Sequence, residues 1–230
     1  MIDEMGRSHS LAVLASLEPA VPPELARLAE GWDPSAEPVV PRAAASVVLC
    51  RDGGSGLETY LLHRHARMAF AASMAVFPGG GVDPVDTSAP DPWLACGIRE
   101  TREETGVDLG AAVLLPWAHW ITPAVQPLRY DTFFYLAALP AGQAAADLST
   151  ETERAAWTAP VLAVAAYAAG DLAMMPPTLA IMTELAQLST VADALALGQD
   201  RVVETVLPEV VRGADGWVYR YPRPGGTAAG

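Results

Sequence analysis

The chain has 230 residues, of which 51% are hydrophobic, and a net charge of −13 from 27 acidic side chains and 14 basic side chains, all arginine. A chain of this length can bury one sizeable core, so we expect a single domain with extensions. Because the charge is acidic and no basic run occurs, a nucleic-acid-binding surface is excluded. Two cysteines, Cys50 and Cys96, do not make a disulfide framework.

The first 40 residues are rich in proline and acidic side chains, which predicts a loosely packed lead-in with one short helix at 23–29. The apolar run at 11–15 is too short for an export signal and follows two acidic residues, Asp3 and Glu4. No apolar run approaches the ~20 residues that a membrane span needs. We therefore expect a cytoplasmic protein that does not bind membranes.

Two strands are predicted next, at 43–50 and 58–63, joined by a glycine-rich hairpin turn at 52–56. A third short strand at 75–77 ends at Pro78, and Gly79, Gly80 and Gly81 follow it. Glycines in such a loop allow the backbone to approach a ligand closely.

A helix is predicted from Trp93 to Thr105. Asp91 suits the capping position before this helix, Pro92 suits its first turn, and Gly106 suits the left-handed position that ends it.

Three carboxylates, Glu100, Glu103 and Glu104, share one face of this helix because they are spaced at i, i+3 and i+4. Like charges at this spacing repel, so the helix has no folding reason to cluster them. A divalent cation supplies a reason, since Mg²⁺ or Mn²⁺ prefers carboxylate oxygens and completes its shell with water and substrate phosphates. The alternative, a solvated helix face, does not explain the glycine loop upstream.

Further strands are expected near 112–120, 130–138 and around Trp157, with helices at 159–169, 177–188 and 191–197. A late strand is expected at 217–221, and a mobile tail at 223–230. Mixed strands with helices on both sides predict an α/β fold, an α/β/α sandwich over residues 41–222.

The segment from Phe77 to Val107 resembles the Nudix box, G-x5-E-x7-R-E-U-x-E-E-x-G-U, in which U is aliphatic. Its second half is matched at six positions: Arg99, Glu100, Glu103, Glu104, Gly106 and Val107. Thr101 occupies an aliphatic slot. The first half is about five residues longer than the pattern, so its acidic slot falls on Asp86 or on Asp91.

The resemblance covers about residues 42–190 and is strongest to the Nudix branch that includes peroxisomal coenzyme A diphosphohydrolases and their bacterial relatives. It carries on through segments 117–123, 129–135, 151–160 and 175–179. It implies a Nudix-type sandwich with a mixed sheet, and an Mg²⁺- or Mn²⁺-dependent hydrolase that cleaves a diphosphate linkage.

Each site residue has an expected role. We expect Glu103 and Glu104 to bind the metal, Glu100 to bind it or to orient the attacking water, and the carbonyl of Gly79 or Gly80 to complete the shell. Arg99 is expected to pair with a box carboxylate and fix its rotamer. The resemblance also implies a later carboxylate, from Glu151 or Glu153; we favour Glu153.

Coenzyme A or acyl-coenzyme A is the first choice of substrate, followed by ADP-ribose, NADH and nucleotide sugars. Arg64 and Met68 match the motif that coenzyme A-cleaving members carry before the box, whereas Ala69, Ala71 and Ser73 replace its later Arg, His and Gly. Arg129 is expected either to hold a phosphate or to form a surface ion pair.

Two other classes of function stay open. The chain could be a non-catalytic Nudix-fold binding module, although such modules usually lose box acids, or a partner-binding protein whose alanine-rich helices form a homodimer surface. An isomerase on the same fold lacks a suitably placed cysteine. His63 and His65 have no further ligand at metal-binding spacing, and His119 is interpreted as a packed strand residue.

Overall fold

The computed structural model describes residues 21–65, 67, 71 and 73–221. Its largest element is an eight-stranded mixed sheet with the order β3-β2-β1-β6-β5-β8, to which β4 and β7 add by pairing with β1 and β2. The strands are β1 (Arg42–Gly53), β2 (Gly56–Arg64), β3 (Ala75–Val76), β4 (Gly79–Gly81), β5 (Leu114–Ile121), β6 (Tyr130–Ala138), β7 (Thr152–Thr158) and β8 (Thr205–Val206).

Strand β1 is the centre of the sheet. It runs antiparallel to β2 and β4 along one edge and parallel to β6 along the other. Its middle is fully buried from Val47 to Cys50, as expected for a strand covered on both faces.

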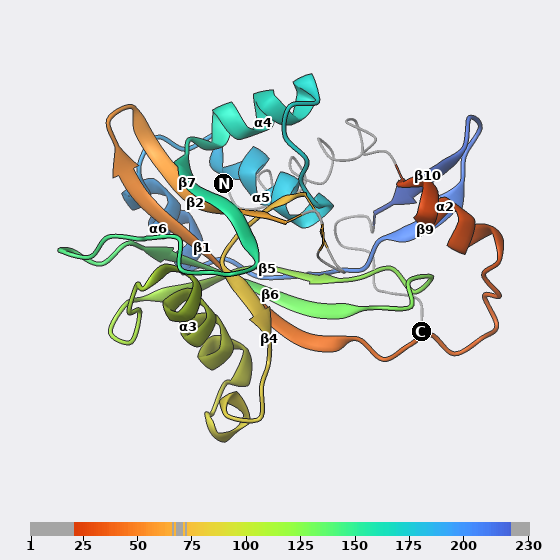
Figure 1. Cartoon of the computed structure of the whole chain (residues 1–230), viewed down its shortest axis with the longest axis horizontal. Helices are drawn as coiled ribbons and strands as arrows, with labels where there is room; N and C mark the ends of the chain where they lie inside the picture. The colour runs from red at the N-terminus through yellow and green to blue at the C-terminus, as the bar shows by residue number, and fades with distance from the viewer. Residues whose placement is uncertain (1–20, 66, 68–70, 72, 222–230) are drawn as a thin grey trace.

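Helices cover both faces of this sheet (Figure 1). They are α3 (Pro92–Thr105) on one side and α4 (Pro160–Ala169), α5 (Pro176–Leu185) and α6 (Val191–Gln199) on the other. Gly97 of α3 lies against Val47, whereas Val48 shares a core cluster with Leu179 of α5 and Ala194 of α6. Alternate residues of β1 therefore face opposite helix layers, and the expected α/β/α sandwich is confirmed.

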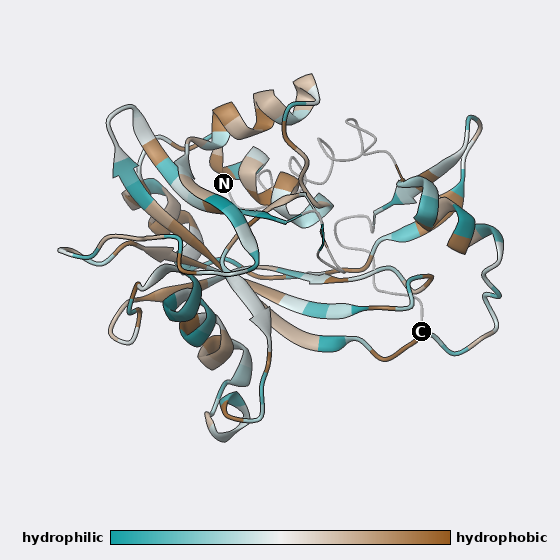
Figure 2. Cartoon of the chain, in the orientation of Figure 1, coloured by the Kyte–Doolittle hydropathy of each residue, from teal (hydrophilic) through white to brown (hydrophobic). Residues whose placement is uncertain are grey.

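The helix layers differ in polarity. In Figure 2, α4 and α5 carry brown segments, whereas the C-terminal part of α3 is largely teal. The burial agrees with this difference: α5 is buried from Thr178 to Leu185, whereas α3 carries the three acids Glu100, Glu103 and Glu104.

A second, two-stranded sheet of β9 (Glu209–Arg212) and β10 (Trp217–Arg220) packs with α2 (Pro23–Glu30) at one end of the molecule (Figure 1). Leu25 and Ala29 of α2 share a cluster with Val125, Val210 and Trp217. This small core attaches the hairpin and α2 to the loop that joins β5 and β6.

Most element boundaries lie within three residues of those predicted. The predictions for the segments 1–20 and 223–230, and for Met68 and Ala69, lie outside the described residues. No helix in the part of the chain that the structure describes is long and apolar enough to cross a membrane.

The main difference is β4, predicted as a loop. Its three glycines form a strand paired with Ala44–Ser46 of β1. A Cβ at Gly79 would approach the Ala45 carbonyl oxygen to less than 3.0 Å, so close pairing with β1 requires a residue without a side chain. Strands β8 and β9 were also not predicted.

Candidate active site

The carboxylates of α3 lie at a cavity of about 670 Å³. Its walls come from β1, β4, α3, the strands β5 and β6, the loop before β7, the start of α5 and the segment from β8 to β10. Parts of the chain that are far apart in sequence therefore form one chamber.

Helix α3 is fixed at both ends as its sequence predicts. The Asp91 side chain accepts a hydrogen bond from the Leu94 N–H (3.0 Å), and Gly106 ends the helix in the left-handed conformation at φ 74°. These caps set the rotation of the helix, and its acidic face meets the glycines of β4.

Glu104 is the most deeply buried of the three helix carboxylates, at 9% exposed. Its Oε2 accepts a hydrogen bond from the Gly79 N–H at 2.8 Å. Burial raises the pKa of Glu104 to about 7, and the negative charges of Glu100 and Glu151 add to the rise. The ionised form of Glu104 is therefore disfavoured here, and a cation close to its carboxylate would stabilise it.

Glu100 is also shielded from water, and burial raises its pKa while the Arg99 guanidinium opposes that rise. Its carboxylate lies against Gly80, where a Cβ would approach Oε1 to less than 3.0 Å. Glu103, one turn away, is the exposed member, with 59% of its side chain accessible.

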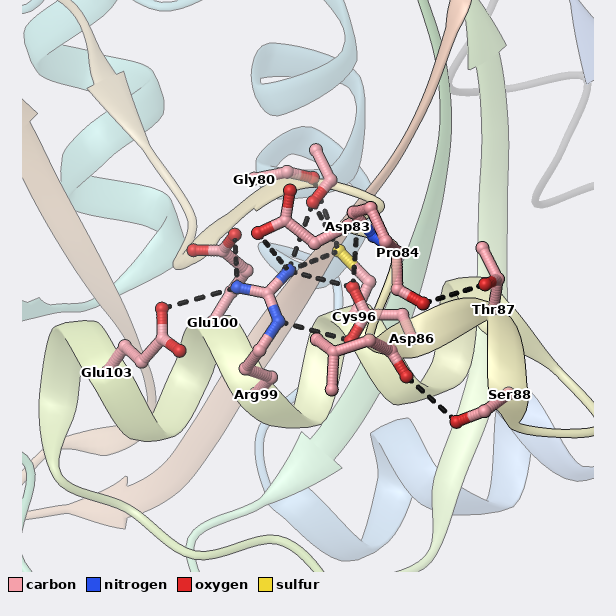
Figure 3. A network of polar contacts seen from close by, with 12 residues as sticks. Gly80, Asp83, Pro84, Asp86, Thr87, Ser88, Cys96, Arg99, Glu100 and Glu103 are labelled. Carbon is pink, nitrogen blue, oxygen red and sulfur yellow. Dashed lines mark hydrogen bonds and ion pairs between the residues drawn. The ribbon is translucent and has the colours of Figure 1, made fainter.

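Arg99 connects these acids to the inserted segment before the helix (Figure 3). Its Nη1 donates to Glu100 (2.8 Å) and Glu103 (3.2 Å), as expected from sequence, while Nε and Nη2 hold both oxygens of Asp86 (3.1 and 2.8 Å). The Arg99 hydrogen bonds lower the pKa of the buried Asp86 carboxyl. Asp86 therefore anchors Arg99, and the other candidate for the first acidic slot, Asp91, is the helix cap.

The donor set fits Mg²⁺ or Mn²⁺. Among the described residues, no three His, Cys, Asp or Glu side chains form a ready-made metal cluster, but Mg²⁺ is usually held by one or two carboxylates with waters and substrate phosphates. Glu100 and Glu104 supply two desolvated carboxylates. The Gly79 N–H donates to Glu104, so the glycine strand lies directly beside these carboxylates. Both Gly79 and Gly80 pair with β1, opposite Ser46 and Ala45, and both line the cavity.

Of the two candidates for the late carboxylate, Glu151 lies at the cavity, and Glu153, the one favoured from sequence, does not. Glu151 lines the cavity and pairs with Nη2 of Arg64 at 2.9 Å, whereas Glu153 is exposed on β7 outside the cavity lining. The strand starts at Thr152, and its pairing with β2 is irregular between His63 and Arg64. That irregularity places Glu151, in the preceding loop, beside Arg64.

Arg64 lines the cavity, as expected for a substrate-binding side chain, but Arg129 does not. Arg129 is 5% exposed and donates to the carbonyl oxygens of Val39 (2.7 Å) and Thr122 (3.0 Å). It is neither a surface ion pair nor a cavity residue; it ties the entry to β1 to the end of β5.

Two other sequence interpretations hold. His119 packs on the Phe133 ring with a 4.0 Å centroid separation, between Asp131 and Thr205. Cys50 and Cys96 are both free and buried. Sequence reasoning missed the contributions of Pro208 and Tyr219 to the cavity, because neither carries a local motif.

With this geometry established, comparison with known proteins is direct. A model of the NUDIX domain matches residues 40–176, more than half of the chain. The chain belongs to the Nudix family.

Two relatives of this Nudix chain illustrate the match. "Putative nudix hydrolase 7" of Caenorhabditis elegans is 29% identical over 184 residues, covering 64% of this chain and 61% of the relative. The chain thus spans less than two thirds of that relative's length. The crystal structure of a NUDIX hydrolase from Alicyclobacillus acidocaldarius aligns with a TM-score of 0.62 at 23% identity, covering 68% of this chain and 96% of that one. The likeness shows a shared fold.

Proposed function

We propose that this Nudix protein is a divalent-metal-dependent hydrolase that cleaves the diphosphate linkage of a nucleoside-diphosphate derivative. The observation that carries the proposal is the pair of desolvated carboxylates, Glu100 and Glu104, facing the bare backbone of β4 in a cavity of about 670 Å³. That volume lies in the range of small-molecule sites, roughly 300–1,000 Å³. Of these two buried acids, only Glu100 forms an ion pair with an arginine among the described residues, and this excess of negative charge is what a metal with an anionic substrate completes.

The proposed ligands are Glu100, Glu103, Glu104 and the Gly79 carbonyl, holding Mg²⁺ or Mn²⁺. When bound, the cation neutralises the diphosphate and makes water a better nucleophile. The Gly79 N–H holds Glu104 in place, and Arg99 holds Glu100 and Glu103.

Arg64 and Glu151 have complementary proposed roles. The Arg64 guanidinium, at the cavity wall, binds a substrate phosphate and in doing so gives up its ion pair with Glu151. The freed Glu151 carboxylate then accepts a proton from the attacking water.

Coenzyme A or acyl-coenzyme A is the first substrate class to test, because Arg64, the residue shared with the coenzyme A motif, faces the cavity. ADP-ribose, NADH and nucleotide sugars are the alternatives. A non-catalytic binding module is disfavoured because all three box acids are kept beside the cavity.

The test is a mass-spectrometric hydrolysis panel with Mg²⁺ or Mn²⁺ over coenzyme A, acyl-coenzyme A, ADP-ribose, NADH and UDP-glucose. Turnover by the wild type should be lost in Glu104→Gln. Glu151→Gln should slow it strongly, and Glu153→Gln, the matched control on the exposed strand, should leave it unchanged. Binding of a panel compound without any product would favour the binding module, and equal effects of the two later variants would exclude Glu151 as the proton acceptor.

A further inference from the structure

The cavity has two chemically different ends. Among the described lining residues, the charged side chains are Arg64, Glu100, Glu103, Glu104 and Glu151, all associated with the α3 end. The remaining wall is uncharged and largely apolar, and its members include Trp120, Leu128, Tyr130, Met175, Pro208 and Tyr219.

The sheet register separates these ends. Gly81 lies opposite Ala44, Ala44 opposite Thr132, and Thr132 opposite Trp120. Three strand spacings of about 4.8 Å place Trp120 about 14 Å across the sheet from the glycine strand. A diphosphate held at α3 therefore leaves the rest of the substrate to extend toward Trp120.

Tyr219 belongs to a group of contacting aromatic rings at this distal end. It stacks on Tyr221 with ring centroids 6.2 Å apart, and Tyr221 meets Trp120 edge-on at 6.1 Å. On β10, Tyr219 lies opposite Val210, and the α2 core packs on the same hairpin. Burial raises the pKa of Tyr219 to about 12, which agrees with a water-poor environment.

Part of the distal wall lies outside the segment that matches the NUDIX domain model. Pro208 and Tyr219 come from outside residues 40–176, the segment that matches the NUDIX domain model. The same holds for α2, which supports the hairpin.

We propose that the distal end of the cavity receives an uncharged, apolar group of the substrate, either a ring or an alkyl chain, and that Tyr219 is the residue that determines this specificity. The inference rests on the proposed function and names the chemistry of the substrate's second half. Among the described residues of the distal wall, a charged group placed there would find no oppositely charged side chain to replace its hydration, whereas an apolar group gains contact with aromatic faces.

The test compares kcat and KM for two substrate pairs that differ at one end: NADH against ADP-ribose, and octanoyl-coenzyme A against coenzyme A. The first pair tests a ring in the distal end, and the second pair tests an alkyl chain there. In at least one pair the wild type should favour the member with the apolar group, and Tyr219→Ala should raise the KM of that member about tenfold or more, with kcat and the other member unchanged. Tyr219→Phe should keep the preference.

Trp217→Ala is the control, since Trp217 is on the same strand but does not line the cavity. Equal losses in Trp217→Ala and Tyr219→Ala would assign the effect to the hairpin and overturn the role of Tyr219. Turnover with no preference in either pair would overturn the proposal while leaving the hydrolase function intact. If the wild type hydrolyses none of the four, the proposed function fails only when UDP-glucose is not hydrolysed either. Calorimetric titration of the same pairs then decides the inference: the distal site stands only if the apolar member binds more tightly and Tyr219→Ala removes that difference.

Discussion

At the scale of single residues, Glu104 combines two properties that oppose each other. Its carboxylate is buried, which disfavours ionisation, yet its proposed metal-binding role needs the ionised form. The Gly79 N–H offsets part of the burial, and a bound cation would offset the rest. Without metal, the folded protein should therefore hold a proton on Glu104 that the unfolded chain has already lost.

This makes stability depend on pH in metal-free protein. The pKa of Glu104 is about 7 in the fold against an ordinary value of 4.5, so between those values the folded state binds more protons than the unfolded state. The free energy of unfolding should fall as pH rises through this window, by up to about 3 kcal/mol, and level off above it. Urea unfolding in EDTA from pH 4 to 8 measures the profile.

Comparison with Glu104→Gln isolates the contribution of this one group. The amide does not titrate, so the variant should lack the decline, and the difference between the two profiles should grow from pH 4.5 to 7. Glu103→Gln, which changes an exposed carboxylate of the same helix, should follow the wild type. Parallel profiles for wild type and Glu104→Gln would show that burial does not perturb Glu104.

At the scale of elements, two adjacent residues of β4 must be glycine for different reasons. Gly79 must approach the backbone of β1, whereas Gly80 must approach the carboxylate of Glu100. A Cβ at the first position meets a fixed carbonyl, and a Cβ at the second meets the movable end of a side chain.

We therefore expect Gly79→Ala and Gly80→Ala to differ in kind. Gly79→Ala should lower the free energy of unfolding by about 1–3 kcal/mol, because the strand pair must separate. Gly80→Ala should cost less stability but displace Glu100, and so lower kcat more than the stability loss explains. Chemical unfolding and steady-state kinetics on both variants check this, and a Gly80→Ala enzyme with normal kcat would count against a role for Glu100.

At the scale of the whole molecule, a buried ion pair joins three parts of the chain. Arg201, just after α6, forms a two-pronged pair with Glu184 of α5 at 2.6 and 3.0 Å and donates to the Trp117 carbonyl of β5. The Trp117 indole N–H donates to the same Glu184 carboxylate, and the guanidinium lies over the indole ring at 4.4 Å. The network fixes the helix layer against the sheet.

Arg201→Met should destabilise the fold by about 3–5 kcal/mol, because it leaves the Glu184 carboxylate buried without a cation. Adding Glu184→Leu should recover much of this loss, since the unpaired charge is then gone. Arg220→Met, which removes an exposed partner of Glu209, should change stability by less than about 1 kcal/mol. Urea unfolding compares the three, and a mild effect of Arg201→Met alone would contradict the burial of this pair.

The local sequence was sufficient to predict an element or a site residue wherever the contacts that determine its position are also local. Asp91 and Gly106 define α3 through bonds within a few residues, and the i, i+3, i+4 spacing places the three acids together. The choice between Glu151 and Glu153 depended on an irregular register between β2 and β7, almost 90 residues apart, which no local pattern encodes.

Tertiary contacts explain the other differences. Arg129 is indistinguishable in sequence from a surface arginine, and its burial follows from contacts with Val39 and Thr122. Tyr219 reaches the cavity only because the hairpin docks on the α2 core. The sequence thus predicted the residues at the acidic end of the cavity and missed those that Pro208 and Tyr219 add at its distal end.

The central place of β1 also has a consequence during synthesis. Its parallel partner β6 begins at Tyr130, opposite Arg42, so 130 − 42 = 88 residues separate the paired positions. The edge of the apolar run at Val47–Leu49 that pairs with β6 therefore has no partner until β6 is made. At about 5–20 residues per second, a ribosome needs roughly 4–18 seconds to deliver β6. During that interval the nascent chain exposes an unpaired, aggregation-prone strand edge. A chaperone that shields this edge would raise the yield of folded protein.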